Sequence, residues 1–165
     1  MSKNADYARR LATAINCLDG IYARGAAGNG VKPGVLDLLY ILDDSGANTV
    51  HTQKSISEEW ILPYTTVNTI TKACEADGYV EQIPIPGKRR EKQIVMTEKG
   101  KAFAKETLDK VYKAESAAIR KTLKECDPAF IEAMEAYTRN LKEAFDKYVN
   151  DEAHKCCKSG DGAAK

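Results

Sequence analysis

The sequence predicts a mainly α (α+β) fold, in which a winged helix-turn-helix lies between N- and C-terminal helices. Two neighbouring patterns predict it. Residues 52–78 hold two short amphipathic segments separated by an Ile-Leu-Pro break, which is the pattern of a helix-turn-helix. Residues 79–97 hold two β-rich runs around a Pro-Gly turn, which predict a hairpin. A helix-turn-helix followed by a hairpin is a winged helix, and the small β-hairpin is its wing.

Composition excludes several classes of protein. With 165 residues, 43% of them hydrophobic, the chain is long enough for one domain with an oligomerisation arm. Its formal net charge is only +1, so any contact with nucleic acid must come from local clusters of charge. No window of about 18 uncharged apolar residues occurs, and the N-terminus has no signal-type apolar segment. We therefore expect a cytoplasmic protein without a membrane partner.

Cysteine and histidine are too few and too irregularly spaced for a disulfide framework or a metal site. The five cysteines have no regular spacing, and no Cys-x-x-Cys pair occurs. The only histidines are His51 and His154. No Gly-rich phosphate loop and no nucleophile–base pair is found either. We expect no metal, no cofactor and no enzymatic activity.

The N-terminal part predicts two helices and a loop. Residues 5–24 place apolar and aromatic side chains at spacings of three and four, which is typical of an amphipathic helix. Four glycines and a proline in residues 25–34 predict a loop. Residues 35–46 are apolar on nearly all sides and predict a short buried helix that ends at an Asp-Ser-Gly turn.

In the helix-turn-helix, Ile56 and Trp60 lie four apart on the first helix. Pro63 ends this helix, because a proline disfavours helical geometry in the residue before it, and Pro63 itself suits the first turn of the next helix. The inner stripe of the second helix consists of Val67, Ile70 and Cys74. Gly78 is placed to end that helix.

The wing joins two predicted strands, residues 79–83 and 92–97. Its loop carries four cations, which are Lys88, Arg89, Arg90 and Lys92. After subtraction of Glu91 the loop offers about three net positive charges, and each phosphate that it neutralises releases a counterion. Arginine also suits a narrow minor groove, whose potential is more negative. A solvated hairpin tip is the structural alternative.

Two further helices are predicted after the wing. Thr97 suits an N-cap, and an "ECDP" break at residues 125–128 separates the helices, with Asp127 able to cap the second. The last helix repeats apolar or aromatic residues at spacings of three and four, namely Phe130, Met134, Tyr137, Leu141, Phe145 and Tyr148. This near-heptad seam needs a partner, because the rest of the domain is too small to bury it, so we predict a second copy of the chain. Residues 151–165 are small and polar and predict a flexible tail.

Residues 52–100 resemble the MarR family of bacterial winged-helix transcription regulators. The segments "TQKSISEEW", "TTVNTITKACEADGYV" and "MTEKG" carry the resemblance, in this order. It implies a homodimer whose interface is made by the first helix and the last two, a recognition helix in the major groove and a wing over the minor groove. It also implies a ligand site between the dimer helices and the DNA-binding lobe.

The sequence departs from the family pattern at three places. Ile61 stands where the family has a turn glycine before the recognition helix, and Thr69 stands where an arginine is often found. At the wing tip, Lys88 replaces an acidic residue two positions before Arg90. These changes leave the fold intact and concern the base preference.

Patterns and resemblance together divide the chain into four parts. Residues 1–30 form an N-terminal helix and loop for dimerisation, and residues 31–97 form the winged helix-turn-helix DNA-binding domain. Residues 98–150 form the C-terminal dimerisation helices, and residues 151–165 form the tail.

The outer face of the recognition helix is predicted to read DNA. Its candidate residues are Tyr64, Thr65, Thr66, Asn68, Thr69 and Lys72. Hydroxyl and amide groups both donate and accept hydrogen bonds, which suits base edges and phosphates. Asn68 is the best candidate for adenine, through bidentate pairing of its amide. For the threonines, local capping or packing is the structural alternative.

The predicted function is a sequence-specific transcription regulator, a repressor that acts as a homodimer on a palindromic operator in double-stranded DNA and is released by a small-molecule effector. Five tyrosines could line the effector site or belong to the core: Tyr7, Tyr22, Tyr40, Tyr112 and Tyr137. One alternative is a thiol-based redox regulator, as in some members of the family, with Cys17 on the first helix as the redox residue. The other is a winged helix that docks protein instead of DNA.

Overall fold

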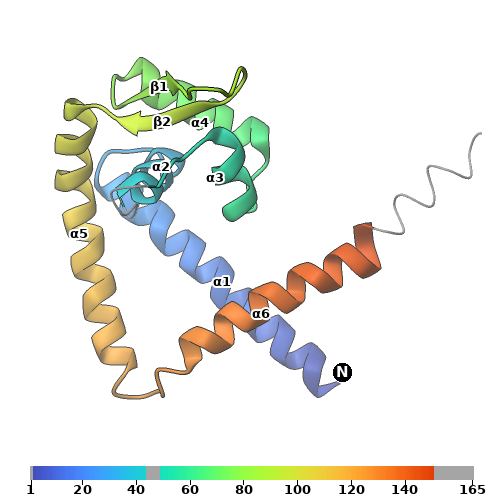
Figure 1. Ribbon diagram of the computed structural model, residues 1–165. Helices are drawn as coiled ribbons and strands as arrows, with labels where there is room; N and C mark the ends of the chain where they lie inside the picture. The colour runs from blue at the N-terminus through green and yellow to red at the C-terminus, as the bar shows by residue number, and fades with distance from the viewer. Residues whose placement is uncertain (1, 44–48, 151–165) are drawn as a thin grey trace, which may run out of the picture. The chain divides into compact units, whose positions relative to one another are not determined.

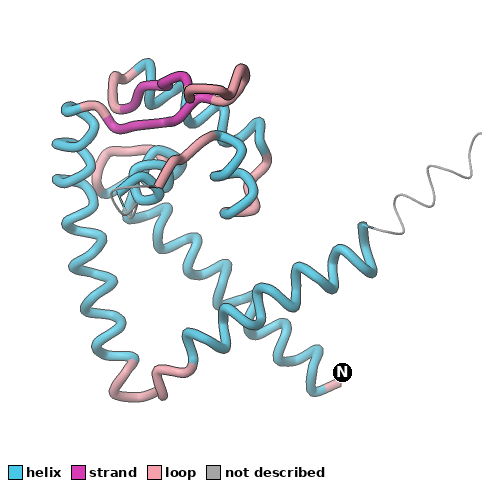
Figure 2. The backbone as a smooth tube through the Cα atoms, viewed as in Figure 1, coloured by secondary structure: helices cyan, strands magenta, loops and turns pink. Residues whose placement is uncertain are grey.

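The computed structural model describes residues 2–43 and 49–150 and shows a mainly helical chain with one antiparallel hairpin (Figure 1). Its elements are α1 (Lys3–Gly28), α2 (Pro33–Asp43), α3 (Gln53–Glu59), α4 (Tyr64–Ala76), β1 (Val80–Pro84), β2 (Lys92–Met96), α5 (Glu98–Thr122), α6 (Phe130–Phe145) and a π-helical turn, η1 (Asp146–Asn150). The predicted winged helix-turn-helix is confirmed, with the hairpin between helices as Figure 2 shows. The tail of residues 151–165 and the Asp-Ser-Gly turn lie outside the described residues.

The chain divides into two compact units, the first ending at Ala114 and the second beginning at Glu115, both within α5. None of the described helices combines the length and the apolar character that a membrane crossing requires.

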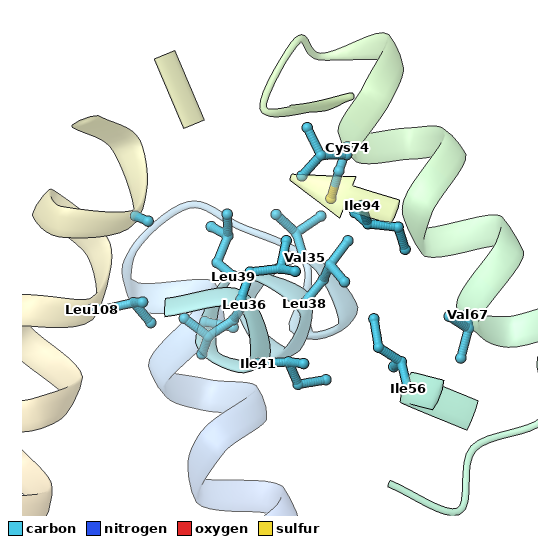
Figure 3. Packing of buried hydrophobic residues seen from close by; sticks show 14 residues of the cluster. Val35, Leu36, Leu38, Leu39, Ile41, Ile56, Val67, Cys74, Ile94 and Leu108 are labelled. Atoms are coloured by element: carbon cyan, nitrogen blue, oxygen red, sulfur yellow. The ribbon is translucent and has the colours of Figure 1, made fainter. Parts of the chain in front are cut away.

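The core of the first unit is built around α2, as the all-round apolar pattern of that helix predicts. Six of its eleven residues are buried, and Leu39 is completely inaccessible. Side chains from the other elements surround them, as Figure 3 shows for Val67 and Cys74 of α4 and Leu108 of α5. The buried apolar residues are Ala26, Val35, Leu36, Leu38, Leu39, Ile41, Leu42, Ile56, Val67, Cys74, Val80, Ile94, Ala104 and Leu108. Burial of this apolar surface is the dominant favourable term that holds the recognition helix and the wing in place.

The prediction of a loop over residues 25–34 is wrong at both ends, because α1 continues to Gly28 and α2 already begins at Pro33. Ala26 is fully buried, and this packing offsets the poor helix propensity of the glycines around it. Asn29 follows as the C-cap, and its side chain donates to the carbonyl of Gly25 at 3.0 Å. Gly30 has φ +71°, which is the left-handed conformation common after a helix C-terminus.

The turn between α3 and α4 confirms the predicted Ile-Leu-Pro break. Ile61 has φ +51°, which is the only positive φ of a non-glycine residue in the described chain. Ser57 fastens the turn, because its hydroxyl donates to the carbonyl of Leu62 at 2.6 Å. Pro63 lies just before the first residue of α4 and serves as its N-cap position. At the other end Gly78, with φ +72°, follows the helix as predicted.

The wing is an antiparallel pair whose register runs from Val80 opposite Met96 to Pro84 opposite Lys92. Its tip is a β-turn in which the Lys88 amide donates to the Ile85 carbonyl at 3.0 Å and Gly87 has φ +80°, as a type II turn requires. The wing is tied to the entry of α3, since the Ile94 amide donates to the His51 carbonyl at 2.8 Å. After the wing, the hydroxyl of Thr97 accepts from the Gly100 amide at 3.0 Å, so Thr97 caps α5 as predicted.

The second unit contains the end of α5, α6 and η1. Asp127 precedes α6 and accepts from the Ala129 amide at 2.8 Å, although α6 itself begins only at Phe130. No residue of α6 is buried in the single chain, and Phe145 keeps 53% of its surface exposed. The near-heptad seam therefore lies on a helix whose apolar face the single chain leaves accessible.

Candidate nucleic-acid interface

The first helix of the helix-turn-helix begins with a capping box that fixes its polar first turn. The Thr52 hydroxyl accepts from the Ser55 amide at 3.0 Å, and the Ser55 hydroxyl accepts from the Thr52 amide at 3.0 Å. Gln53 and Lys54 lie inside this box, so their backbone positions are set by it. An isolated bridge pairs Thr52 with Gln93 of β2, which places the start of α3 beside the wing.

The recognition helix α4 presents its N-terminal half to solvent. Tyr64 is 56% exposed, and Thr65, Thr66, Thr69 and Lys72 are exposed as well. The opposite face buries Val67 and Cys74, as the predicted stripe requires, and also Thr71. Ile70, the third residue of the predicted stripe, is only half-buried against the core. No side chain caps the N-terminus of α4, so its positive end faces outward.

A groove of about 290 Å³ lies between α3, α4 and the wing. It is lined by Thr52, Gln53, Lys54, Tyr64, Asn68, Lys72, Gln82, Arg90, Glu91 and Lys92. Five of the residues predicted from the sequence thus meet in one place, namely Tyr64, Asn68, Lys72, Arg90 and Lys92. The groove combines amides and hydroxyls from helices with cations from the wing.

The amide of Asn68 is held by a chain of polar side chains. Gln53 lies with its Nε2 3.4 Å from Asn68 Oδ1 and 3.4 Å from Gln82 Oε1. Gln82 donates in turn to Glu75 Oε2 at 3.0 Å. Sequence reasoning missed Gln53, Lys54 and Gln82, although the polar first turn "TQKS" of the first helix pointed toward this surface.

The three predicted threonines lie outside this groove. Thr65, Thr66 and Thr69 line a separate shallow hollow of about 260 Å³ on α4, together with Ile70. The hydroxyl of Thr69 donates to the Thr65 carbonyl at 2.8 Å, so its proton is used within the helix and only its lone pairs face outward.

At the wing tip, one of the four cations is paired. Lys88 Nζ lies 2.7 Å from Glu91 Oε2, and this hydrogen bond and the charge of Lys88 lower the pKa of Glu91. Arg89, Arg90 and Lys92 form no ion pair within the described chain. Lys88 and Arg89 lie at the tip beyond the groove, whereas Arg90 and Lys92 reach its wall.

The cysteines differ in their surroundings. Cys74 is fully buried, and desolvation followed by the charge of Asp77 raises its pKa to about 11, so it is an unreactive thiol of the core. Cys17 on α1 and Cys126 are exposed free thiols. The other two cysteines of the chain lie outside the described residues. Within the described ranges no group of three His, Cys, Asp or Glu side chains could hold a metal ion.

A second and larger cavity lies away from the groove. It measures about 560 Å³ and is walled by α1, α2, α5 and the turn that follows α3. Of the five tyrosines considered for a ligand site, Tyr22 and Tyr40 line it. Tyr112 packs behind them, with its ring 5.7 Å from that of Tyr40.

Comparison with solved structures shows that this fold is shared with known regulators. A MarR family regulator from Neisseria meningitidis matches with a TM-score of 0.67 at 23% identity, over 87% of this chain and 96% of that one. The transcription regulator MarR from Oenococcus oeni PSU-1 matches with a TM-score of 0.66 at 14% identity, over 83% of this chain and 98% of that one. A MarR family transcriptional regulator from Rhodococcus sp. RHA1 matches with a TM-score of 0.63 at 17% identity, over 90% of this chain and 99% of that one. No family model and no curated protein sequence matches the chain. The chain therefore has a MarR-type winged-helix fold.

Proposed function

Starting from this shared fold, we propose that the chain is a MarR-type regulator of transcription that binds double-stranded DNA by sequence and has no catalytic role. The observation that carries the proposal is the groove in which the amide of Asn68 and the wing cation Arg90 lie together. The Asn68 amide can hydrogen-bond to a base edge, and the positive charge of Arg90 can contact the phosphates of the DNA backbone.

The proposed docking follows from the placement of these groups. Helix α4 enters the major groove with its exposed N-terminal half, so that Asn68 meets an adenine edge. The wing then lies along the neighbouring backbone, where Arg90 and Lys92 contact phosphates or the minor groove. Lys54 and Gln53 at the start of α3 add a polar contact on the other side of the groove.

Function as a homodimer on a palindromic operator is the second part of the proposal. The apolar seam of α6 supports it, since a face with Leu141, Phe145 and Tyr148 exposed in the single chain is suited to a second copy. Two recognition helices must then meet successive major grooves about 34 Å apart. Repression would follow where the operator overlaps a promoter.

Release by a small molecule is the third part. The cavity of about 560 Å³ lies in the same compact unit as α4 and has the size of ligand sites. Such a ligand would bind more tightly to a form of the dimer in which the two recognition helices are wrongly spaced for DNA. It would then lower the affinity for DNA, and only by as much as its own affinity differs between the two forms. A thiol-based switch is the second candidate for release, because Cys17 is an exposed free thiol. Measuring DNA binding before and after peroxide treatment tests it.

The experiment that tests the main proposal is selection of bound duplexes from random DNA, followed by mobility shifts at two ionic strengths. We expect an inverted-repeat site and an affinity that falls steeply with salt. Absence of duplex binding even at low salt would refute the proposal and favour a winged helix that docks protein.

A further inference from the structure

The cavity of about 560 Å³ differs in charge and lining from the candidate nucleic-acid groove between α3, α4 and the wing. It is lined by Asp19, Tyr22, Ala23, Pro33, Leu36, Asp37, Tyr40, Trp60, Leu62 and Val111, and none of these residues lines the groove. All of them belong to the first compact unit. Its volume is in the range of sites for drug-sized ligands.

The charge in this cavity is entirely negative. Asp19 of α1 and Asp37 of α2 are the charged residues of its lining, and no lysine, arginine or histidine accompanies them there. Neither carboxylate has an ion-pair or hydrogen-bond partner in the part of the chain that the structure describes. Partial desolvation and the charge of Asp19 raise the pKa of Asp37, as expected for two carboxylates that line one cavity.

Aromatic rings make up much of the remaining lining. Tyr40 is held between two rings, since its centroid lies 6.4 Å from that of Trp60, in an edge contact, and 5.7 Å from that of Tyr112. Tyr22 from α1 lines the cavity as well. Aromatic faces attract cations, and the effect is strongest for tryptophan. The aliphatic residues Leu36, Leu62 and Val111 add apolar surface.

We propose that this cavity binds an amphipathic organic cation, whose positive charge lies against Asp19 and Asp37 and whose apolar body packs on Tyr22, Tyr40 and Trp60. An aromatic anion of the same size would meet two uncompensated carboxylates, and a neutral ligand would leave them without a partner. The binding itself needs no DNA. Only the role of the cation as an effector rests on the proposed regulator function.

Two ions of similar size and shape but opposite charge test the proposal directly. Tetraphenylphosphonium and tetraphenylborate are titrated into the full chain at one ionic strength. Trp60 is the only tryptophan of the chain and lines the cavity, so its fluorescence reports occupancy, and calorimetry gives the stoichiometry and affinity. We expect saturable binding of the phosphonium and at least about tenfold weaker binding of the borate.

Charge-removing variants locate the effect. Asp37→Asn and Asp19→Asn should each weaken phosphonium binding by about tenfold, whereas Asp6→Asn, on the exposed start of α1, should leave it unchanged. Borate binding as tight as phosphonium binding, no phosphonium binding, or full binding by both cavity variants would each overturn the proposal.

Cation binding by the cavity can be tested separately from the proposed regulator function, because a mobility shift in the absence of either organic ion tests DNA binding alone. A chain that binds the phosphonium but no duplex upholds the cavity and refutes the regulator. A chain that binds duplex but not the phosphonium does the reverse.

Discussion

Gln53 Nε2 lies 3.4 Å from Asn68 Oδ1, so the first helix of the helix-turn-helix holds the amide on the second helix that we propose reads a base. The same Gln53 reaches Gln82 on the wing strand β1, also at 3.4 Å. Three elements that are distant in sequence thus share one hydrogen-bond network. A networked amide keeps one orientation, which is what bidentate reading of a base requires.

Removal of either amide is expected to relax base specificity. Asn68→Ala should reduce discrimination at one operator position by about 1–3 kcal/mol, and Gln53→Ala should reduce it at the same position by less. Binding constants for duplexes that carry each base at that position provide the measurement. Glu59→Ala, on the same helix as Gln53, serves as the control and should change nothing. Unchanged discrimination in Asn68→Ala would show that this face does not read bases.

Loss of a wing cation is expected to weaken binding to every sequence alike. Arg90→Ala removes a charge that has no ion-pair partner in the described chain, so it should lower affinity uniformly and reduce the salt slope by about one. Affinities at several salt concentrations measure this effect. Lys105→Ala, an exposed cation on α5, is the matched control. An identical salt slope for Arg90→Ala and the unaltered chain would exclude the proposed phosphate contact.

Substitution of Leu141→Glu is expected to break the proposed homodimer. A glutamate in the α6 seam would be buried without a partner at the interface, so dimer affinity should fall by about a hundredfold or more. Sedimentation at several concentrations gives the dissociation constant. Asn140→Glu adds the same charge one residue away from the seam and should leave the assembly intact. A chain that sediments as a single copy before any substitution would refute the dimer.

Relief of backbone strain should stabilise the turn before α4. Ile61 adopts φ +51°, which is unfavourable for a β-branched residue, so Ile61→Gly should raise the free energy of unfolding by about 1 kcal/mol. Urea denaturation measures the change. Ile83→Gly, an exposed residue of β1 without a positive φ, should instead lower stability by about 0.5–1 kcal/mol. A loss of stability in Ile61→Gly would mean that the isoleucine side chain contributes more than its backbone costs.

The raised pKa of Asp37 predicts a pH-dependent stability difference. Because burial and Asp19 raise this pKa in the folded chain, the protonated carboxyl favours folding, and that contribution is lost as pH rises through the raised pKa. Asp37→Asn should therefore be more stable than the unaltered chain at neutral pH. The two should converge below about pH 3, where aspartate is largely protonated in both states. Urea denaturation of the variant and of the unaltered chain at both pH values tests this. A constant difference across this range would contradict the assignment.

Periodicity was sufficient to locate most elements. The spacing of Ile56, Val67 and Cys74 identifies the inner faces of α3 and α4, and the Pro-Gly turn identifies the wing, because these signals depend on local geometry alone. The end of α1 was not predictable in this way. There the burial of Ala26 in the core outweighs the helix-breaking tendency of neighbouring glycines, and burial depends on residues that are distant in sequence.

The candidate site, too, was predictable from the sequence only in part. Residue type and position on α4 and the wing were enough to nominate Asn68 and Arg90, since an amide can pair with an adenine edge and a cation can neutralise phosphates. Their meeting with Gln53 and Gln82, the separate place of the threonines, and the presence of Asp19 and Asp37 in one cavity were decided by tertiary structure alone. Chain order determines which side chains a helix or strand presents, but only packing of the apolar core determines which of those faces come together.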